Sequence, residues 1–474
     1  MLLRNSTRQY RVITVLAIEL LSLIKYAWIK EKGDRMFNNN HSLLILTLLS
    51  VLQLTGCAHN SAYRTNYQPC AYSQPGDCAD RAVQHHTAGQ SDEYYLSFIE
   101  FDDQGQLWDR EQLHKVLDNY YTIAGIDDVL LVAYIHGWHH NADPEDDNIK
   151  EFRQLLSKLS QAESHGGTAR KVLGVYIGWR GESIDIPVIN AATFWDRKNT
   201  AHNVAQQGVT EVLLRLEEIV NVKAGMETAT PKPLNSRLVT IGHSFGGAVL
   251  YTALQQILED RFIDSRKNKT FTGNANGFGD LVILLNPAFE ALRYATLYDM
   301  SQDYCRSYFP YQLPKLAILT SETDRATGWA FPAGRSLTTF FETHSTLDRH
   351  NCTGIGKINP IEIAEGEADR QAIGHFEPYR THRLNPLTSS VKRRMNFDYR
   401  GLQNRWSQQK MSGSFAFENT ELIHLGKTVP DNPYLNIQVD RHLIEGHNDI
   451  WHDEIVSFLR DLIMISTTPG QSAQ

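Results

Sequence analysis

One serine lies in a run that suits nucleophilic chemistry, Gly-His-Ser-Phe-Gly at residues 242–246. Four apolar or β-branched residues (238–241) precede the run, and an apolar segment at 248–258 follows it. This order predicts a strand, a sharp turn and a helix, with the Ser244 hydroxyl held out at the turn. Gly242 and Gly246 suit such a turn because side chains there would collide where the strand and the helix cross. An incidental serine in an ordinary strand-to-helix turn is the simpler interpretation.

A serine hydroxyl becomes an effective nucleophile only when a base takes its proton and hydrogen-bond donors stabilise the oxyanion. The helix predicted after Ser244 directs its first backbone N–H groups toward the serine, where they favour developing negative charge. The rest of the chain must therefore supply a base, a group that orients the base, and a second oxyanion donor.

The stretch Gly242-His243-Ser244-Phe245-Gly246-Gly247 resembles the nucleophile elbow of the α/β-hydrolase superfamily, in its lipase and esterase branch. That superfamily carries a His-Gly pair at the end of its third core strand. Here His136 and Gly137 follow the continuous apolar run 129–135. The resemblance implies that the backbone N–H groups of Trp138 and Phe245 form the oxyanion hole.

The acid of the triad is expected in the turn after the penultimate core strand, because the superfamily order is serine, acid, histidine. The apolar run 314–320 is followed by Asp324, which is our first choice. Glu322, in the same turn, and Glu290, after the preceding strand, remain alternatives. Asp324 is also a residue type that forms turns without any catalytic role.

The base is expected in the loop between the last strand and the closing helix. Residues 435–440 alternate as a strand does, and 454–464 carry the apolar spacing of an amphipathic helix. His447 lies between them and is our first choice for the base. His442 and His452 are alternatives, and a solvent-exposed loop histidine is the simpler interpretation.

Strand and helix patterns alternate through most of the chain, which predicts an α/β fold with a doubly wound, mostly parallel sheet. Ligands bind outside the carboxyl ends of the strands in such sheets, and the candidate residues all fall there. The strand patterns cover 94–101, 129–135, 171–179, 238–241, 280–287, 314–320 and 435–440. The core domain is therefore expected over 92–325 and 434–466.

A long insertion at 326–433 separates the candidate acid from the last strand. It is rich in aromatic residues, including Trp329 and Phe341, which argues against disorder. We interpret the insertion as a cap that shapes an acyl or alcohol pocket over the site. A purely structural excursion is the alternative for most of its length.

The composition excludes one class of partner. The chain has 474 residues, a net charge of −8 and 42% hydrophobic residues, as an ordinary globular protein does. No basic stripe could neutralise phosphates, so nucleic acid is not an expected partner. No cofactor is implied. The histidines at 136, 139 and 140 do not suggest a metal site, because the adjacent His139 and His140 cannot easily face one ion.

The N-terminal segment resembles a bacterial lipoprotein leader. A short apolar run at 43–52 is followed by Leu54-Thr55-Gly56-Cys57, which is similar to a lipobox. The resemblance implies a leader over 1–56, lipidation of Cys57, and a membrane anchor in the cell envelope, with Ala58 favouring the outer membrane. A cleaved secretory peptide or a plain anchor helix is the alternative, and Met36 is an alternative start. Residues 57–91 are polar and are interpreted as a tether.

Four cysteines remain after Cys57, and an even number in an exported protein permits two disulfides. Cys70 and Cys78 are close enough in sequence to pair, which leaves Cys305 with Cys352. Free buried thiols are the alternative.

Together these patterns predict a serine hydrolase that cleaves a small or lipid-like carboxylic ester through an acyl-enzyme. An acyltransferase or thioesterase would use the same three residues. A catalytically silent binding or scaffold protein tethered to the envelope is the alternative from another functional class. The sequence does not identify the substrate.

Overall fold

The computed structural model describes most of the chain beyond residue 60. The described ranges are 61–73, 77–87, 91–166, 169–181, 198–225, 235–265, 274–302, 308–309, 311–339, 341–352, 358–387, 397–408 and 413–469. All belong to one compact unit, Ala58–Gln474. The predicted leader, the lipidation site Cys57 and the Cys305–Cys352 pairing lie outside what is described. Among the described residues, no helix combines the length and apolar character needed to cross a membrane.

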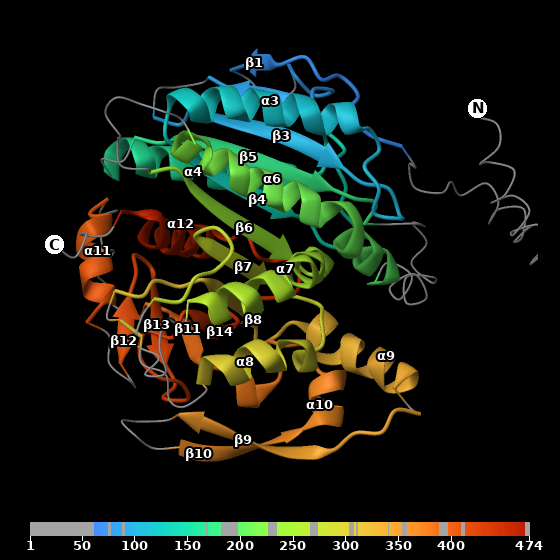
Figure 1. Ribbon diagram of the computed structural model, residues 1–474, viewed down its shortest axis with the longest axis vertical. Helices are drawn as coiled ribbons and strands as arrows, with labels where there is room; N and C mark the ends of the chain where they lie inside the picture. Colours follow the sequence, from blue (N-terminus) through green and yellow to red (C-terminus); the bar gives the residue numbers. More distant parts are fainter. Residues whose placement is uncertain are drawn as a thin grey trace, which may run out of the picture. The chain divides into compact units, whose positions relative to one another are not determined.

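Twelve strands of the described chain form one mostly parallel sheet (Figure 1), in the order β1-β2-β3-β5-β4-β6-β7-β8-β14-β11-β13-β12. The strands from β3 to β11 in this order run parallel to their neighbours. The strands are β1 Cys70–Tyr72, β2 Val83–His86, β3 Tyr94–Glu100, β4 Val129–Ile135, β5 Lys171–Gly178, β6 Arg237–His243, β7 Leu281–Leu285, β8 Leu316–Ser321, β11 His382–Pro386, β12 Ser414–Ala416, β13 Thr420–His424 and β14 Tyr434–Val439. A separate antiparallel pair is formed by β9 Thr346–Cys352 and β10 Ile358–Ala364.

Helices cover both faces of the sheet, as expected for a doubly wound fold. The α-helices are α3 Arg110–Ile126, α4 Asp147–Gly166, α6 Thr210–Val220, α7 Phe245–Asp264, α8 Ala295–Gln302, α9 Phe331–Thr338, α10 Glu365–Arg370, α11 Tyr399–Trp406 and α12 Asp453–Thr467. Short 3-10 or π-helical turns are η1 Ala205–Val209, η2 Val222–Gly225, η3 Ala291–Tyr294, η5 Ala326–Ala330 and η6 Glu377–Tyr379.

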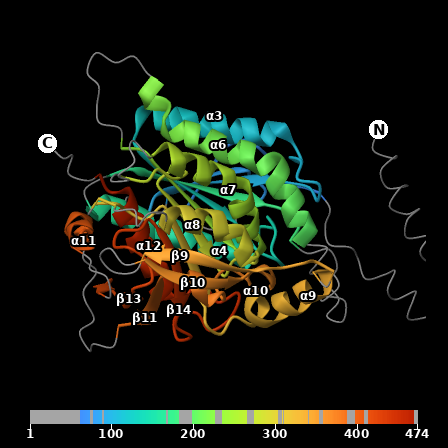
Figure 2. The ribbon, with the colours of Figure 1, turned by 60° about the horizontal axis from the view of Figure 1, so that its bottom comes forward.

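Two apolar cores hold these layers together, one on each face of the sheet. One core joins the sheet to α3, α6, α7 and α8, and Figure 2 shows α3, α6 and α7 side by side. The other core joins the sheet to α4, α11 and α12. β4 is buried along its whole length, and its successive side chains enter the two cores alternately. A strand buried on both faces reads as a continuous apolar run, which explains why the sequence pattern identified it.

The sequence prediction of an α/β fold with a mostly parallel sheet is confirmed, and the fold is compatible with that of an α/β-hydrolase. The predicted disulfide between Cys70 and Cys78 is also confirmed, with Cα atoms 5.9 Å apart.

The structure differs from the predicted tether over 57–91. Residues 70–72 and 83–86 form β1 and β2, and β2 pairs antiparallel with β3. These two segments therefore belong to the sheet. Polar composition misled the prediction, because these short strands lack apolar alternation and depend on the edge of β3 and on the disulfide.

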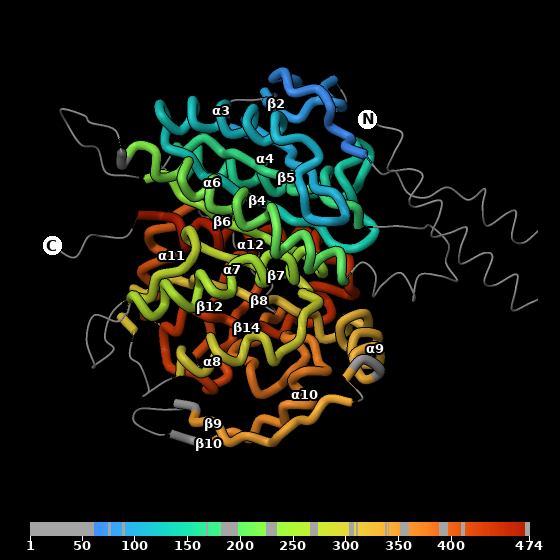
Figure 3. Tube along the Cα trace, turned by 45° about the vertical axis from the view of Figure 1, so that its right-hand side comes forward, coloured from blue at the N-terminus to red at the C-terminus, as the bar shows by residue number. Residues whose placement is uncertain are grey.

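The insertion at 326–433 also differs in part from the predicted cap. Its second half supplies β11, β12 and β13, and β11 pairs parallel with β14. These strands widen the sheet, because the edge of β14 offers unpaired backbone groups that another strand can satisfy. Its first half supplies η5, α9, α10 and the antiparallel β9–β10 pair, which lies beyond α10 and far from β2 (Figure 3).

Candidate active site

Ser244 lies at a strained turn between β6 and α7. Its backbone has φ 56° and ψ −120°, a conformation that non-glycine residues rarely adopt. The turn is fixed by the backbone: Ser244 N–H donates to Leu285 O at 2.9 Å, and Ser244 O accepts from Ala288 N–H at 3.0 Å. A strained residue persists when its surroundings hold it in this way, as the sequence pattern predicted for a nucleophile.

The two glycines of the elbow are required by close backbone approach. A Cβ atom on Gly242 would lie 2.6 Å from Gly246 O, and one on Gly246 would lie 2.2 Å from Ile135 O. Both distances are far below van der Waals contact, so only glycine allows β6, α7 and the end of β4 to approach this closely.

The structure brings Ser244, His447 and Asp324 together from three strand ends. His447 Nε2 lies 2.6 Å from Ser244 Oγ, and His447 Nδ1 lies 2.8 Å from Asp324 Oδ2. A carboxylate only accepts hydrogen bonds, so Nδ1 of neutral His447 carries the proton and Nε2 is free to accept from the serine hydroxyl. This arrangement allows His447 to accept the proton of Ser244 and to pass it on.

Asp324 is held as a carboxylate. Its oxygens accept from the backbone N–H groups of Ala326 at 2.9 Å and Thr327 at 3.2 Å, and from the Thr327 hydroxyl. Burial alone would raise the pKa of Asp324, but the charge and hydrogen bond of His447 and the Thr327 donors outweigh it and lower that pKa to about 2. The side chain is therefore ionised at neutral pH and can orient an imidazole.

The loop that carries His447 is fixed by two buried side chains. The backbone carbonyl of His447 accepts from Asn286 Nδ2 at 2.8 Å and from His243 Nε2 at 3.0 Å. Burial, and next the charge of a protonated His447, lower the pKa of His243 to about 3, so its ring stays neutral. The carbonyl requires a donor, which places the single proton of His243 on Nε2.

His136 and Gly137 lie beside the serine, at the end of β4. His136 is fully buried, accepts from Trp179 N–H at 3.0 Å through Nε2, and donates from Nδ1 to Gly137 O at 2.8 Å. Burial lowers the pKa of His136 to about 4. A Cβ atom on Gly137 would lie 2.8 Å from Ser244 Cβ, so this loop passes directly against the serine. Trp138, the candidate oxyanion donor, follows it.

The alternative acids are engaged elsewhere. Glu322 pairs with Arg383 at 3.0 Å. Glu290 is buried and pairs with Lys198, with Arg293 at 2.9 Å and with Arg335 at 3.2 Å. Burial would raise the pKa of Glu290, but these cations, first Lys198, lower it to about 2.

The alternative bases have partners of their own. His442 Nδ1 lies 2.7 Å from Asp440 Oδ1, and His452 Nε2 lies 2.7 Å from Asp449 Oδ2. Both histidine side chains are at least half exposed to solvent. Of the histidines considered, only His447 contacts Ser244.

A cavity of about 760 Å³ opens beside the triad. Asp324 and His447 line it together with Trp329 and Arg441, whereas Ser244 is only 3% exposed. Trp329 is 77% exposed, so the rim of the cavity presents a large aromatic side chain from η5.

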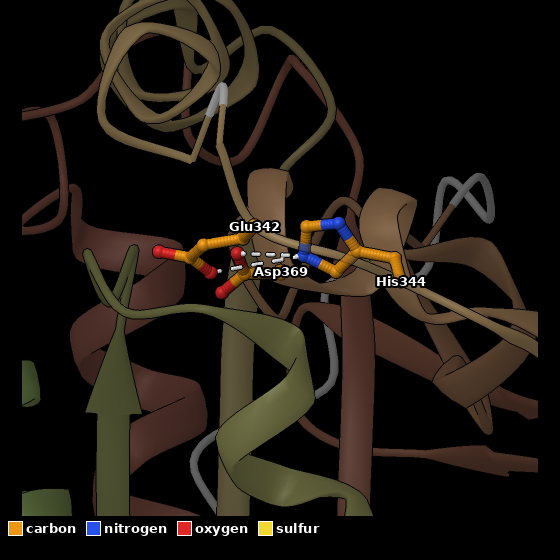
Figure 4. A group of neighbouring side chains, drawn as sticks. All are labelled: Glu342, His344 and Asp369. Carbon is orange, nitrogen blue, oxygen red and sulfur yellow. Dashed lines mark hydrogen bonds and ion pairs between the residues drawn. The ribbon is translucent and has the colours of Figure 1, made fainter.

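Glu342, His344 and Asp369 form another group of titratable side chains (Figure 4). His344 Nε2 lies 3.4 Å from Asp369 Oδ2 and 3.8 Å from Glu342 Oε2. Asp369 is already bound by Arg335 at 2.6 Å. The charge of this carboxylate is therefore compensated within the protein, and we assign no metal to the group.

Two residues that support the triad were not identified from the sequence. Asn286 donates to the His447 loop, and its Oδ1 accepts from Ser321 N–H at 2.9 Å, which ties the ends of β7 and β8 to that loop. Thr327 contacts Asp324 and, at 3.0 Å, His375 Nε2. Asn286 follows a buried strand directly in the sequence and has φ 42°, but only the fold shows what its side chain contacts.

No known protein-family model matches this chain, and no curated protein matches it either. A solved structure to which it has a faint likeness is the phospholipase PlaB from Legionella pneumophila in complex with thio-NAD. The sequences are 15% identical, the TM-score is 0.20, and the match covers 50% of this chain and 48% of that one. The chain thus spans about half the length of this neighbour.

Proposed function

We propose that this protein is a serine hydrolase that cleaves a carboxylic ester through an acyl-enzyme, with Ser244 as nucleophile, His447 as base and Asp324 as acid. The observation that carries the proposal is the continuous row of hydrogen bonds from Ser244 Oγ through the His447 imidazole to the Asp324 carboxylate. A strained serine at the start of a helix, placed at the carboxyl end of a parallel strand, supports the same function.

In the first half-reaction, Ser244 Oγ attacks the ester carbonyl carbon while His447 Nε2 accepts the serine proton. The carbonyl oxygen becomes an oxyanion, for which the backbone N–H groups of Trp138 and Phe245 are the proposed donors. His447 then gives its proton to the alcohol oxygen, the C–O bond breaks, and the acyl group remains on Ser244. Asp324 stabilises the imidazolium throughout.

In the second half-reaction, water attacks the acyl carbon and gives a proton to His447. The carboxylic acid leaves as Ser244 regains that proton. The acid product ionises at neutral pH and requires no further group.

The cavity beside the triad is the proposed site for part of the substrate. Trp329 and Arg441 lie on its wall with His447, so an ester placed there would reach the imidazole. Trp329 comes from η5, in the first half of the 326–433 insertion, and we propose that this half contributes the cap.

We also propose that Cys57 is lipidated and anchors the chain in the cell envelope. The lipobox-like residues 54–57 support this. Expression in a Gram-negative bacterium with labelled palmitate tests it: label should enter the wild type and be lost from C57S.

The enzyme proposal is tested with a fluorophosphonate probe, which reacts readily with an activated serine. The full chain in detergent is compared with S244A and H447A, and with H442A and H452A as matched histidine controls. Labelling should be lost in the first two variants and kept in the two controls, because of these three histidines His447 is the one hydrogen-bonded to Ser244.

Absence of labelling in a folded wild type would overturn the enzyme proposal and favour a tethered binding protein. If H447A is still labelled and either H442A or H452A is not, the base is the histidine whose replacement abolishes labelling. Once labelling is established, a series of p-nitrophenyl esters of increasing acyl length would define the substrate class.

A further inference from the structure

A second cavity, of about 680 Å³, lies beside α4, and none of the triad residues lines it. Its walls come from α4, from β1 and β2, and from Cys78 and Ala79 beside the Cys70–Cys78 disulfide. No residue lines both this cavity and the one beside His447. It therefore constitutes a separate site.

Two arginines face this cavity without an acidic partner. Arg64 is 1% exposed; its Nε donates to Ala142 O at 2.9 Å and its Nη1 to Ala79 O, whereas its Nη2 has no hydrogen-bond acceptor. Arg153 donates to the Tyr72 hydroxyl and, at 2.6 Å, to Gln84 Oε1. Within the described ranges, no carboxylate lies at ion-pair distance from either guanidinium.

This arrangement is electrostatically unfavourable as it stands. Burial and next the neighbouring charge of Arg153 lower the pKa of Arg64 to about 10, although the carboxylates of Glu100 and Asp143 oppose this shift. Buried cations are normally paired with anions, and a buried N–H donor without an acceptor is costly. Lys150 and Lys158 also line the cavity, each with an aspartate partner, and the carboxylates of Asp92 and Glu145 line it as well.

We propose that this cavity binds a phosphate ester, with its phosphate group between Arg64 and Arg153. A guanidinium presents several N–H donors in a plane that matches the oxygens of a phosphate. The cavity is much larger than one phosphate, so an organic part of the ligand occupies the remaining space beside Tyr72 and the stacked rings of His86 and Tyr94. The phosphate can come from a soluble metabolite or from a phospholipid headgroup.

Calorimetric titration of the full chain in a non-ionic detergent tests the proposal. Three probes are used: inorganic phosphate, glycerol 3-phosphate, and a short-chain ether-linked phosphatidylglycerol, which has no carboxylic ester to hydrolyse. Binding of glycerol 3-phosphate assigns a soluble ligand, and binding of the ether lipid alone assigns a phospholipid. Either result supports the site.

The variant R153Q should weaken binding of the responding probe by about tenfold, because one charge-assisted contact is lost. S157E provides a second test, since it adds a negative charge one helical turn from Arg153, where it can pair with that guanidinium and repel a phosphate. R215Q is the matched control, because Arg215 is an exposed helical arginine whose ion pair lies on α6. It should bind as the wild type does.

Failure of all three probes to bind folded wild-type protein would overturn the proposal, as would equal binding by wild type, R153Q and S157E. The result is independent of the hydrolase proposal, because binding is measured directly. R153Q should also react with the fluorophosphonate probe as fast as the wild type does.

Discussion

Replacing Asn286 by alanine tests whether the triad depends on the support beneath the His447 loop. Asn286 is fully buried, and its side chain makes three hydrogen bonds: to His447 O at 2.8 Å, to Gly446 O at 3.3 Å and from Ser321 N–H at 2.9 Å. The variant removes all three while leaving Ser244, His447 and Asp324 unchanged.

The expected loss of stability follows from what remains unpaired. Ser321 N–H is buried and would have no acceptor, which costs about 1–3 kcal/mol. Alanine at φ 42° adds about 1–2 kcal/mol of backbone strain. His447 O keeps the His243 donor and therefore adds little. The free energy of unfolding should fall by about 2–5 kcal/mol, a large part of the 5–15 kcal/mol typical of folded domains.

The rate of fluorophosphonate labelling should fall more than the folded fraction does. A displacement of about 1 Å at a catalytic group commonly costs about 10²-fold in rate. The assay measures the second-order labelling rate, corrected for the folded fraction from urea unfolding. N432A is the matched control, because Asn432 is also a buried asparagine with two hydrogen bonds, at 2.7 Å to Thr428 Oγ1 and 3.0 Å from Tyr434 N–H.

Asn432 precedes β14, at the opposite end of that strand from the His447 loop. N432A should therefore lose stability and keep its labelling rate per folded molecule. The reasoning would be refuted if N286A, once corrected for unfolding, reacted as fast as the wild type, or if both variants slowed equally.

Three further outcomes are expected. D324N should label about 10⁴-fold more slowly, because an amide favours the wrong imidazole tautomer, whereas E322Q should stay within about twofold in the same assay. The low pKa of Asp324, about 2 against an ordinary 3.8, stabilises the folded state above pH 4 and loses that contribution as pH falls toward 2. Urea unfolding of D324N should consequently depend less on pH across that range. G246A should lose more than about 3 kcal/mol in the same measurement, since its Cβ would meet Ile135 O, whereas G446A, with open space around its Cβ, should stay within about 0.5 kcal/mol.

Each of these outcomes has a result that would contradict it. Equal labelling of D324N and E322Q would remove Asp324 from its proposed role. An unfolding free energy of D324N that falls as steeply with acid as that of the wild type would mean that another carboxylate dominates. A stable G246A would show that the turn can open.

The elements of the core could be predicted because their signals are local. The runs at 129–135 and 238–241 are buried on both faces, so their composition alone marks them as strands. The elbow was also recognisable from a local signal, because two glycines and a serine at fixed spacing indicate a tight turn. The distances to His447 and Asp324 required the fold, because these residues lie 203 and 80 positions away in the sequence.

What the sequence did not reveal depends on pairing between distant segments. β2 carries the sequence Val-Gln-His-His, which has no apolar alternation, and it is a strand because β3 offers its edge. β11 joins β14 for the same reason, across an insertion of unpredictable path. Asn286 and Thr327 are ordinary turn residues until the strand ends that they connect are brought together.

The strands of the sheet become shorter toward both of its edges. The inner strands β4 and β5 have seven and eight residues, whereas the outermost strands β1 and β12 have three each. An exposed strand edge is a template on which a second chain can add, and the number of backbone bonds available sets how firmly that chain is held. Because each outermost strand is so short, another copy of the chain could form only a few backbone hydrogen bonds with either edge of the sheet. The length of the outermost strands thus protects a wide parallel sheet from fibrous self-association.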